Sequence, residues 1–178
     1  MNESKKIRIV ITGPESTGKT TLATQLAQTF NGLYVAEYAR EYVEHLTGQY
    51  TYGDVENIAR KQIDQYIQAK QSPVKYVFFD TWLIITKVWF EWVFGTVPGW
   101  IEDAISNCPV DLYLLCQPDL PWEPDSVREN GGENRIKLFE KYKEELIQRK
   151  LNFVEISGKG DDRIQKAVLV INDFCQRC

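Results

Sequence analysis

Histidine is nearly absent from this sequence, and positive charge does not dominate it. The 178 residues include one histidine, four cysteines and one methionine, and the formal net charge is −4. A single histidine excludes a metal centre built from several imidazoles. The negative balance argues against a nucleic-acid partner, because phosphate backbones are bound by clustered lysine and arginine. We therefore expect no nucleic acid among the partners.

Long apolar runs are also absent. The most apolar stretch, residues 76–94, is interrupted by Asp80, Lys87 and Glu91, and charged side chains inside such a run disfavour a membrane span. No apolar segment follows the charged first residues, so the pattern predicts no signal peptide. We expect a cytoplasmic protein that does not bind a membrane.

The cysteines do not form a pattern typical of a zinc or redox site. Cys175 and Cys178 are the only close pair, and they lie at the C-terminal end of the sequence without a second pair of ligands. We interpret them as the end of a helix, with a metal or redox site as the alternative. Cys116 ends an apolar run and is expected to be a small buried side chain. We expect His45 on a helix surface.

Length and patterning favour one domain, residues 1–178. Apolar residues make up 43% of the chain and charged residues 26%, as in globular proteins. Strand-like runs alternate with helical stretches, which predicts an α/β fold of three layers: a parallel sheet of about five strands with helices on both faces. Ligands then bind at the C-terminal ends of the strands. The expected strands are residues 7–12, 33–36, 74–79, 110–116 and 153–156.

Helical spacing or composition marks most of the intervening segments. The segment 82–93 is apolar nearly all round, so we expect it to be largely covered by other elements. The expected helices are residues 21–27, 37–46, 51–69, 82–93, 101–106, 134–150 and 162–175.

Residues 13–20 read Gly-Pro-Glu-Ser-Thr-Gly-Lys-Thr and match G-x-x-x-x-G-K-[ST], the phosphate-binding P-loop. The strand before it and the helix after it argue against a chance glycine loop, because that arrangement points backbone N–H groups at phosphates. Lys19 can meet the β- and γ-phosphates of ATP, and the Thr20 hydroxyl can ligate Mg²⁺. The predicted nucleotide-binding residues are Gly13, Glu15, Ser16, Thr17, Gly18, Lys19, Thr20 and Thr21.

Two carboxylates follow expected strands. Asp80 ends the third strand, where a P-loop protein needs an acidic partner for Mg²⁺; a cap for the next helix is the alternative. Glu37 follows the second strand and could accept a proton from a substrate hydroxyl. With Arg40 and Glu41 it could instead form a surface cluster of salt bridges.

Residues 118–136 form a long polar connection that we interpret as a lid. Arg128 and Arg135 could close onto the transferring phosphoryl group, as an arginine finger does, or could simply be exposed on a solvated loop. Trp122 lies in this segment and is the tryptophan that we expect to stack on a substrate ring. Gly158 follows the fifth strand, where the turn could pass close to adenine or simply connect strand to helix.

Four further tryptophans follow Asp80 or lie near it. Core packing or a dimer interface explains most of them as well as an aromatic wall for a flat ring does. We assign catalysis to Lys19, Glu37, Asp80, Arg128 and Arg135. We assign the binding of the acceptor substrate to Glu37, Tyr38, Arg40, Trp122 and Asp125. The oligomeric state is left open and includes a homo-oligomer.

Five pieces of the sequence recur in the order of a known family: residues 13–20, 37–43, 52–54, 79–81 and 121–128. Together they resemble the ribosylnicotinamide kinase domain of NadR-type proteins. The resemblance covers residues 7–172. It implies an adenylate-kinase-like fold and an ATP- and Mg²⁺-dependent phosphorylation of the 5′-hydroxyl of nicotinamide riboside, which gives nicotinamide mononucleotide for NAD synthesis.

The sequence departs from the full-length form of that family. An adenylyltransferase domain needs an H-x-G-H motif, which a chain with only His45 cannot contain. Adenylyl transfer is therefore not expected here. No N-terminal helix-turn-helix segment is seen in the sequence either, so DNA-binding repression is not expected. Two alternatives to a nicotinamide riboside kinase stay open. One is a kinase for another nucleoside, and the other is a nucleotide-dependent switch that transfers no phosphate.

Overall fold

The five expected strands form one parallel sheet in the computed structural model, which describes residues 6–177. Their order is β2-β3-β1-β4-β5, so β1 is central and β2 and β5 are the edges. The strands consist mainly of apolar residues, as expected for a parallel sheet covered on both faces. Their bounds are β1 Ile7–Thr12, β2 Leu33–Val35, β3 Tyr76–Asp80, β4 Leu112–Cys116 and β5 Phe153–Ile156.

Helices connect the strands where the sequence predicts them. The segment 82–93, expected as one helix, divides into an α-helix and a π-helix. The irregular connection 117–131 contains most of the expected lid, residues 118–136, and Arg135 belongs to the helix that follows. The bounds are α1 Lys19–Thr29, α2 Tyr38–Glu44, α3 Tyr52–Gln71, α4 Leu83–Trp89, the π-helix η1 Phe90–Phe94, α5 Gly99–Asn107, α6 Gly132–Gln148 and α7 Gly160–Arg177.

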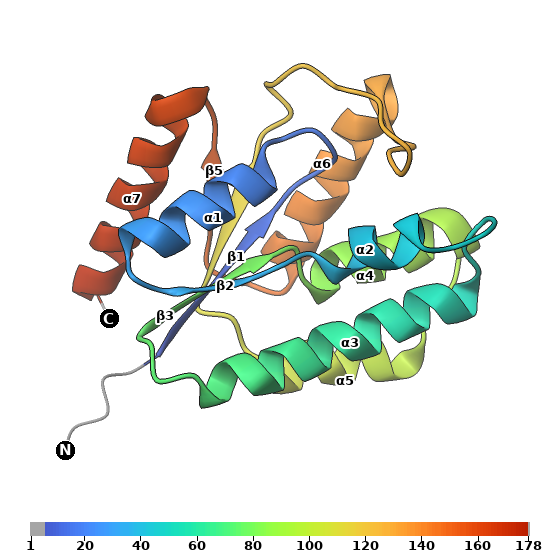
Figure 1. The fold of residues 1–178 in the computed structure, drawn as a ribbon, viewed down its shortest axis with the longest axis horizontal. Coiled ribbons are helices and arrows are strands. Elements are labelled where there is room, and N and C mark those ends of the chain that lie inside the picture. The colour runs from blue at the N-terminus through green and yellow to red at the C-terminus, as the bar shows by residue number, and fades with distance from the viewer. Residues whose placement is uncertain (1–5, 178) are drawn as a thin grey trace.

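The helices cover the two faces of the sheet unequally. Helices α1 and α7 pack together on one face, while α3, α4, α5 and α6 cover the other (Figure 1). Alternate residues of β1 point into these two layers: Ile9 and Ile11 face α1, and Val10 faces the larger layer. Among residues 6–177, no helix has the length and apolar character needed to cross a membrane.

The sheet order places the ends of β1 and β3 side by side. Ile11 pairs with Asp80, so the P-loop that follows β1 starts next to the acidic residue that ends β3. Cys116, at the end of the neighbouring β4, is fully buried, as expected. His45 caps the C-terminus of α2 and is exposed, also as expected. Cys178 lies outside the described residues, so the interpretation of the Cys175–Cys178 pair stays a prediction.

Candidate active site

The P-loop runs from the end of β1 into the first turn of α1. Gly13 has a φ of +140°, and a Cβ there would lie 2.7 Å from the carbonyl oxygen of Cys116. Gly18 has a φ of +72°. Both positions therefore require glycine. A side chain at residue 13 would collide with Cys116, and the positive φ at both residues is unfavourable for any other amino acid. The Lys19 ammonium donates a hydrogen bond to the Pro14 carbonyl at 2.8 Å, which holds it over the loop.

Two buried arginines fix the outer side of the P-loop. Arg135 in α6 donates to the carbonyls of Glu15 (2.9 Å) and Ser16 (2.7 Å). Arg163 in α7 donates to the carbonyl of Thr17. A trans peptide directs its C=O and the following N–H to opposite sides. Holding three successive carbonyls outward therefore turns the next three N–H groups toward the inside of the loop, where phosphates bind.

Arg135 thus acts differently from the prediction. Its guanidinium also donates to the Leu120 carbonyl at 2.7 Å, the residue is only 6% exposed, and it is not among the residues that line the cavity described below. Helix α6 starts at Gly132 and carries this side chain under the P-loop, whereas the sequence pattern suggested a free arginine on a lid. Its place indicates a role in shaping the loop.

Asp80 lies directly beside the P-loop hydroxyl, as predicted. Thr20 Oγ1 donates to Asp80 Oδ2 at 2.6 Å, and the Tyr34 hydroxyl donates to the same oxygen at 3.3 Å. Asp80 is 2% exposed, and its other oxygen, Oδ1, is buried without a hydrogen-bond partner. Burial and the Asp80 charge raise the pKa of Tyr34 to about 12, so this hydroxyl remains a donor.

The donor set fits a hard cation. A hydroxyl and a carboxylate with one unpaired buried oxygen offer the oxygen ligands that Mg²⁺ prefers. Among residues 6–177, no group of three or more His, Cys, Asp or Glu side chains could hold a metal ion. That finding suits Mg²⁺, which is commonly bound through one or two carboxylates together with substrate phosphates.

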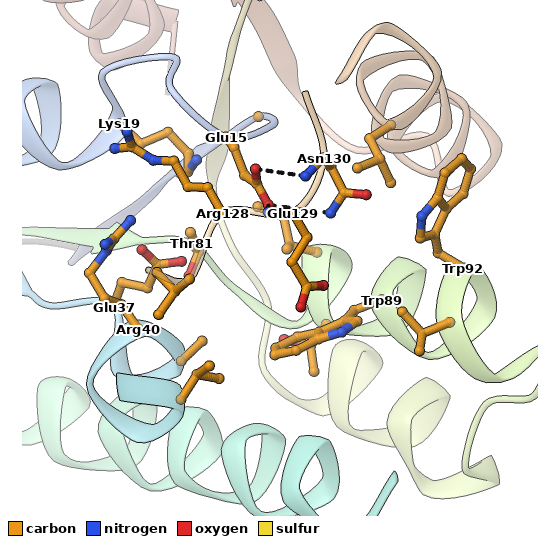
Figure 2. Close-up of a pocket in the computed structure, with 18 of the residues that line it drawn as sticks. Glu15, Lys19, Glu37, Arg40, Thr81, Trp89, Trp92, Arg128, Glu129 and Asn130 are labelled. Atoms are coloured by element: carbon orange, nitrogen blue, oxygen red, sulfur yellow. Dashed lines mark hydrogen bonds between the residues drawn. The ribbon is translucent and has the colours of Figure 1, made fainter. Parts of the chain in front are cut away.

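A cavity opens beside the P-loop, between α2, α4, α6 and the 117–131 connection. Its two ends differ in chemistry (Figure 2). Lys19, Glu37, Arg40 and Arg128 gather at one end, and Trp89 and Trp92 lie at the other. The remaining lining side chains that bear on its chemistry are Tyr50, Gln62, Thr86, Glu129, Asn130 and Tyr142. One cavity therefore joins phosphate-binding groups to an aromatic wall.

Glu37 is the N-cap residue of α2, immediately after β2, and it lines the cavity as the sequence predicted. Desolvation raises the pKa of its carboxyl, and the charges of Asp80 and Glu15 act in the same direction, while Lys19 and Arg40 oppose them. A carboxylate with a raised pKa is a stronger base, which suits a group that must take a proton from a hydroxyl.

The 117–131 connection, which contains most of the predicted lid and is called the lid below, is joined by side-chain contacts to both sides of the cavity. Asp125 Oδ2 accepts a hydrogen bond from Arg40 and forms an ion pair with Arg128, each at 3.1 Å. Asp125 Oδ1 accepts from the backbone N–H groups of Val127 and Arg128, each at 3.0 Å. Asp125 is not among the residues that line the cavity. It connects α2 to the lid and orients Arg128, whereas we predicted direct contact with the acceptor.

The Glu15 carboxylate forms the second set of contacts, which joins the P-loop to the lid. It accepts hydrogen bonds from the backbone N–H groups of Glu129 (3.2 Å) and Asn130 (3.0 Å), and from the indole N–H of Trp122 (3.4 Å). The contacts to Asn130 are dashed in Figure 2. Glu15 was predicted as a nucleotide-binding residue, and in this structure its side chain holds the lid against the P-loop.

The aromatic wall comes from two of the tryptophans after Asp80, for which a wall was the alternative to core packing, and not from Trp122. Trp122 packs on Gly131, where a Cβ would lie 3.2 Å from the indole ring, and it does not line the cavity. Tyr38 also lies elsewhere: it packs against Tyr42, with ring centroids 5.8 Å apart. Trp89 and Trp92 form the wall instead. Trp89 closes α4 and Trp92 lies in the π-helix η1, whose extra residue per turn changes side-chain direction.

An ion pair holds this wall in place. Lys87 in α4 is 6% exposed. Its ammonium lies 2.7 Å from the Glu145 carboxylate in α6 and 2.6 Å from Glu91 in η1. Helices α4 and α6 form two sides of the cavity, so the Lys87–Glu145 ion pair connects these two sides. A buried lysine is tolerated only when it is paired in this way.

Sequence reasoning missed several residues of the site, and four of them bear on the argument here: Tyr34, Thr81, Glu129 and Arg163. Thr81 has a φ of +67° and lines the cavity, and such a conformation is unusual for a β-branched residue. Its place directly after Asp80 could have drawn attention to it. The other three are brought to the site by the fold, and no local sequence pattern marks them.

Two predicted nucleotide-binding residues lie away from the cavity. Gly158 has a φ of +100°, and its N–H donates to Asp119 at 2.6 Å. Thr21 is exposed.

Known proteins are similar to this chain in sequence and in fold. The sequence family described as an AAA domain matches residues 8–163. The trifunctional NAD biosynthesis/regulator protein NadR of Escherichia coli (strain K12) is 30% identical over 173 residues, which cover 93% of this chain and 42% of that protein. The chain thus spans less than half the length of this curated relative.

Solved structures extend the comparison. A NadR protein in complex with NR matches with a TM-score of 0.80 at 24% identity, covering 97% of this chain and 52% of that one. Thymidylate kinase from Ehrlichia chaffeensis matches with a TM-score of 0.68 at 12% identity, covering 94% and 99%. These similarities confirm the predicted fold, which is that of P-loop kinases.

Proposed function

The chain belongs to the AAA domain family and is related to NadR, and from this premise we propose that it is an ATP- and Mg²⁺-dependent nicotinamide riboside kinase. The product is nicotinamide mononucleotide. One observation carries the proposal: a single cavity unites Lys19 and Glu37 with a wall formed by Trp89 and Trp92. A phosphoryl donor and a flat-ringed acceptor can meet in such a cavity.

The proposed reaction uses the residues as follows. The 5′-oxygen of the riboside bonds to the γ-phosphorus of ATP, the bond from that phosphorus to the β,γ-bridging oxygen breaks, and ADP leaves. Glu37 accepts the proton of the 5′-hydroxyl. Lys19 and Arg128 meet the negative charge on the phosphoryl oxygens, and the P-loop N–H groups bind the donor phosphates.

Thr20 and Asp80 are the residues that would hold Mg²⁺, because they supply its preferred oxygen ligands beside the P-loop. When bound, the ion neutralises charge on the phosphates during transfer. The acceptor ring lies against Trp89 and Trp92 in this proposal. The ring of nicotinamide riboside is cationic, and a cation over an indole face is stabilised by about 0.5–2 kcal/mol.

Purified protein with Mg²⁺ and ATP tests the proposal, with nicotinamide riboside, uridine, cytidine and deoxycytidine as acceptors and mass spectrometry of the products. Nicotinamide riboside should be phosphorylated most efficiently, and NAD should not form, because one histidine cannot supply H-x-G-H. Phosphorylation of a pyrimidine nucleoside alone would identify a different nucleoside kinase. Binding of ATP without any acceptor would identify a nucleotide-dependent switch.

A further inference from the structure

Glu129 places a carboxylate beside the aromatic wall of the cavity. It lines the cavity together with Trp89 and Tyr50, and Figure 2 shows its carboxylate above the Trp89 ring. The contacts agree with the picture. The Tyr50 hydroxyl donates to Glu129 Oε2 at 2.9 Å, and the Tyr50 and Trp89 rings pack edge to face with centroids 4.9 Å apart.

The position of this carboxylate is fixed from two sides. Its backbone N–H is held by the P-loop residue Glu15 at 3.2 Å, and its side chain is held by Tyr50. Burial raises the pKa of Tyr50 to about 12, with the charges of Glu129 and Glu15 acting in the same direction, so the tyrosine remains a donor and Glu129 remains the acceptor. Neither contact neutralises the carboxylate.

Charge is distributed unevenly along the cavity. The lining cations Lys19, Arg40 and Arg128 lie at the phosphate end (Figure 2). The lining carboxylates are Glu15, Glu37 and Glu129. Glu37 lies among the cations at the phosphate end and Glu15 binds the Glu129 backbone, whereas the Glu129 carboxylate lies beside Trp89 and Tyr50. A ring bound against Trp89 is therefore close to a carboxylate and to an electron-rich indole face, and both favour a cation.

We propose that Glu129 is a specificity-determining residue that makes this site prefer an acceptor with a positively charged ring over a neutral ring of the same shape. The inference rests on the proposed function and extends it, because it assigns the recognition of ring charge to a lid residue. When the lid is held to the P-loop through Glu15, the carboxylate is delivered to the ring, so charge recognition accompanies closure of the site.

Two acceptors of similar size differ in ring charge: nicotinamide riboside has a cationic, aromatic pyridinium ring, and its reduced dihydro form has a neutral ring that is no longer aromatic. The effect of ring charge is therefore read from how Glu129→Gln changes the preference between them. The wild-type protein should have a higher kcat/KM for the cationic form. Glu129→Gln keeps the shape of the side chain and removes its charge. It should reduce the ratio of the two kcat/KM values by about tenfold, equivalent to about 1.4 kcal/mol, with the KM for ATP unchanged.

Two further variants complete the test. Glu123→Gln removes a carboxylate from the same lid segment but outside the cavity and should leave the ratio unchanged. Tyr50→Phe removes the hydrogen bond to Glu129 and should reduce the ratio by a smaller factor. An equal loss of activity toward both acceptors in Glu129→Gln, or no change, would overturn the inference, because a contact that depends on shape does not distinguish ring charge.

Calorimetric titration of both ribosides keeps this test separate from that of the proposed function. If neither riboside is phosphorylated, the proposed function fails, and the binding ratio still reports the preference for ring charge. Tighter binding of the cationic form that Glu129→Gln abolishes would support the inference even then. Equal binding of the two forms by the wild-type protein would end it.

Discussion

Thr20 and Asp80 meet across neighbouring elements: the Thr20 hydroxyl donates a hydrogen bond of 2.6 Å to Asp80 Oδ2. Thr20 lies in the first turn of α1 and Asp80 ends β3, sixty positions apart in the sequence. The contact exists because β1 and β3 pair in register, with Ile11 opposite Asp80. The second Asp80 oxygen is left buried and unpaired, which leaves it available for a cation or its water.

The first prediction concerns this pair. Asp80→Asn removes the negative charge and should lower turnover by about 10²- to 10³-fold, the range typical of losing one preorganised electrostatic group. The Mg²⁺ concentration needed for half-maximal stabilisation by ATP in a thermal melt should rise. Asp111→Asn is the matched control, because Asp111 pairs with Arg8 at the opposite end of the sheet. Unchanged Mg²⁺ dependence in Asp80→Asn would remove Asp80 from the metal site.

The second prediction is a pH dependence. The pKa of Glu37 lies above its ordinary value of 4.5, chiefly because of desolvation. As a base it must be deprotonated, so turnover should fall as the pH falls through this raised pKa. Glu37→Gln should lower turnover by about 10²- to 10⁴-fold and remove that acidic limb. ATP affinity, measured by equilibrium titration, should change little; a collapse of ATP binding with normal acceptor kinetics would contradict the assignment.

The third prediction follows from the same shift and concerns stability. The folded protein holds the Glu37 proton more tightly than the unfolded chain does, so this group costs stability as the pH rises from the ordinary pKa through the raised one. Glu37→Gln removes that cost. Its melting temperature relative to wild type should therefore rise with pH across this window and stay constant above it. A difference that falls with pH would show that the raised pKa is absent.

The fourth prediction concerns the outer side of the P-loop. Arg163→Lys keeps the charge but cannot hold Thr17, Gly158 and Asp119 together. The loop N–H groups should lose their orientation, and ATP affinity should fall by roughly 10- to 100-fold, because hydrogen bonds to charged groups contribute about 1.5–3 kcal/mol. Calorimetry measures the affinity, and thermal melts measure stability.

Arg8→Lys serves as its control. Arg8 forms a comparable network with Asp111 and Tyr66 at the far end of β1. Both variants should lower the melting temperature, and only Arg163→Lys should weaken ATP binding. Equal ATP affinity in the two variants would mean that Arg163 contributes to stability alone.

The fifth prediction tests the aromatic wall. Trp89→Ala should raise the KM for the acceptor by about 5- to 30-fold, from the loss of roughly 1–2 kcal/mol of ring contact, with a smaller effect on the KM for ATP. Trp100→Ala is the control, because Trp100 bonds to Glu56 outside the cavity. If Trp122→Ala raised the KM for the acceptor more than Trp89→Ala does, the acceptor ring would be assigned to Trp122 and not to Trp89.

The phosphate side of the site could be predicted from the sequence, whereas the acceptor side could not. The P-loop, Lys19, Thr20 and Asp80 follow from local patterns, because a glycine loop between a strand and a helix and an acid at a strand end are defined by neighbouring residues. Trp122 and Arg135 make contacts in this structure that differ from those we predicted, because both lie in or near a polar segment whose packing the sequence pattern does not define. Only the packing of α6 under the P-loop and of Trp122 on Gly131 shows where their side chains point.

The central position of β1 has a consequence for how such a protein can change over evolutionary time. The phosphate site is built on the central strand, which pairs with β3 on one side and β4 on the other, so substitutions there disturb the middle of the sheet. The side chains at the acceptor end come from α2, α4, η1, α6 and an irregular connection, which all lie outside the sheet, so a substitution there need not disturb the strands. Selection can therefore exchange one acceptor for another by altering these segments while the strand that carries the P-loop stays the same.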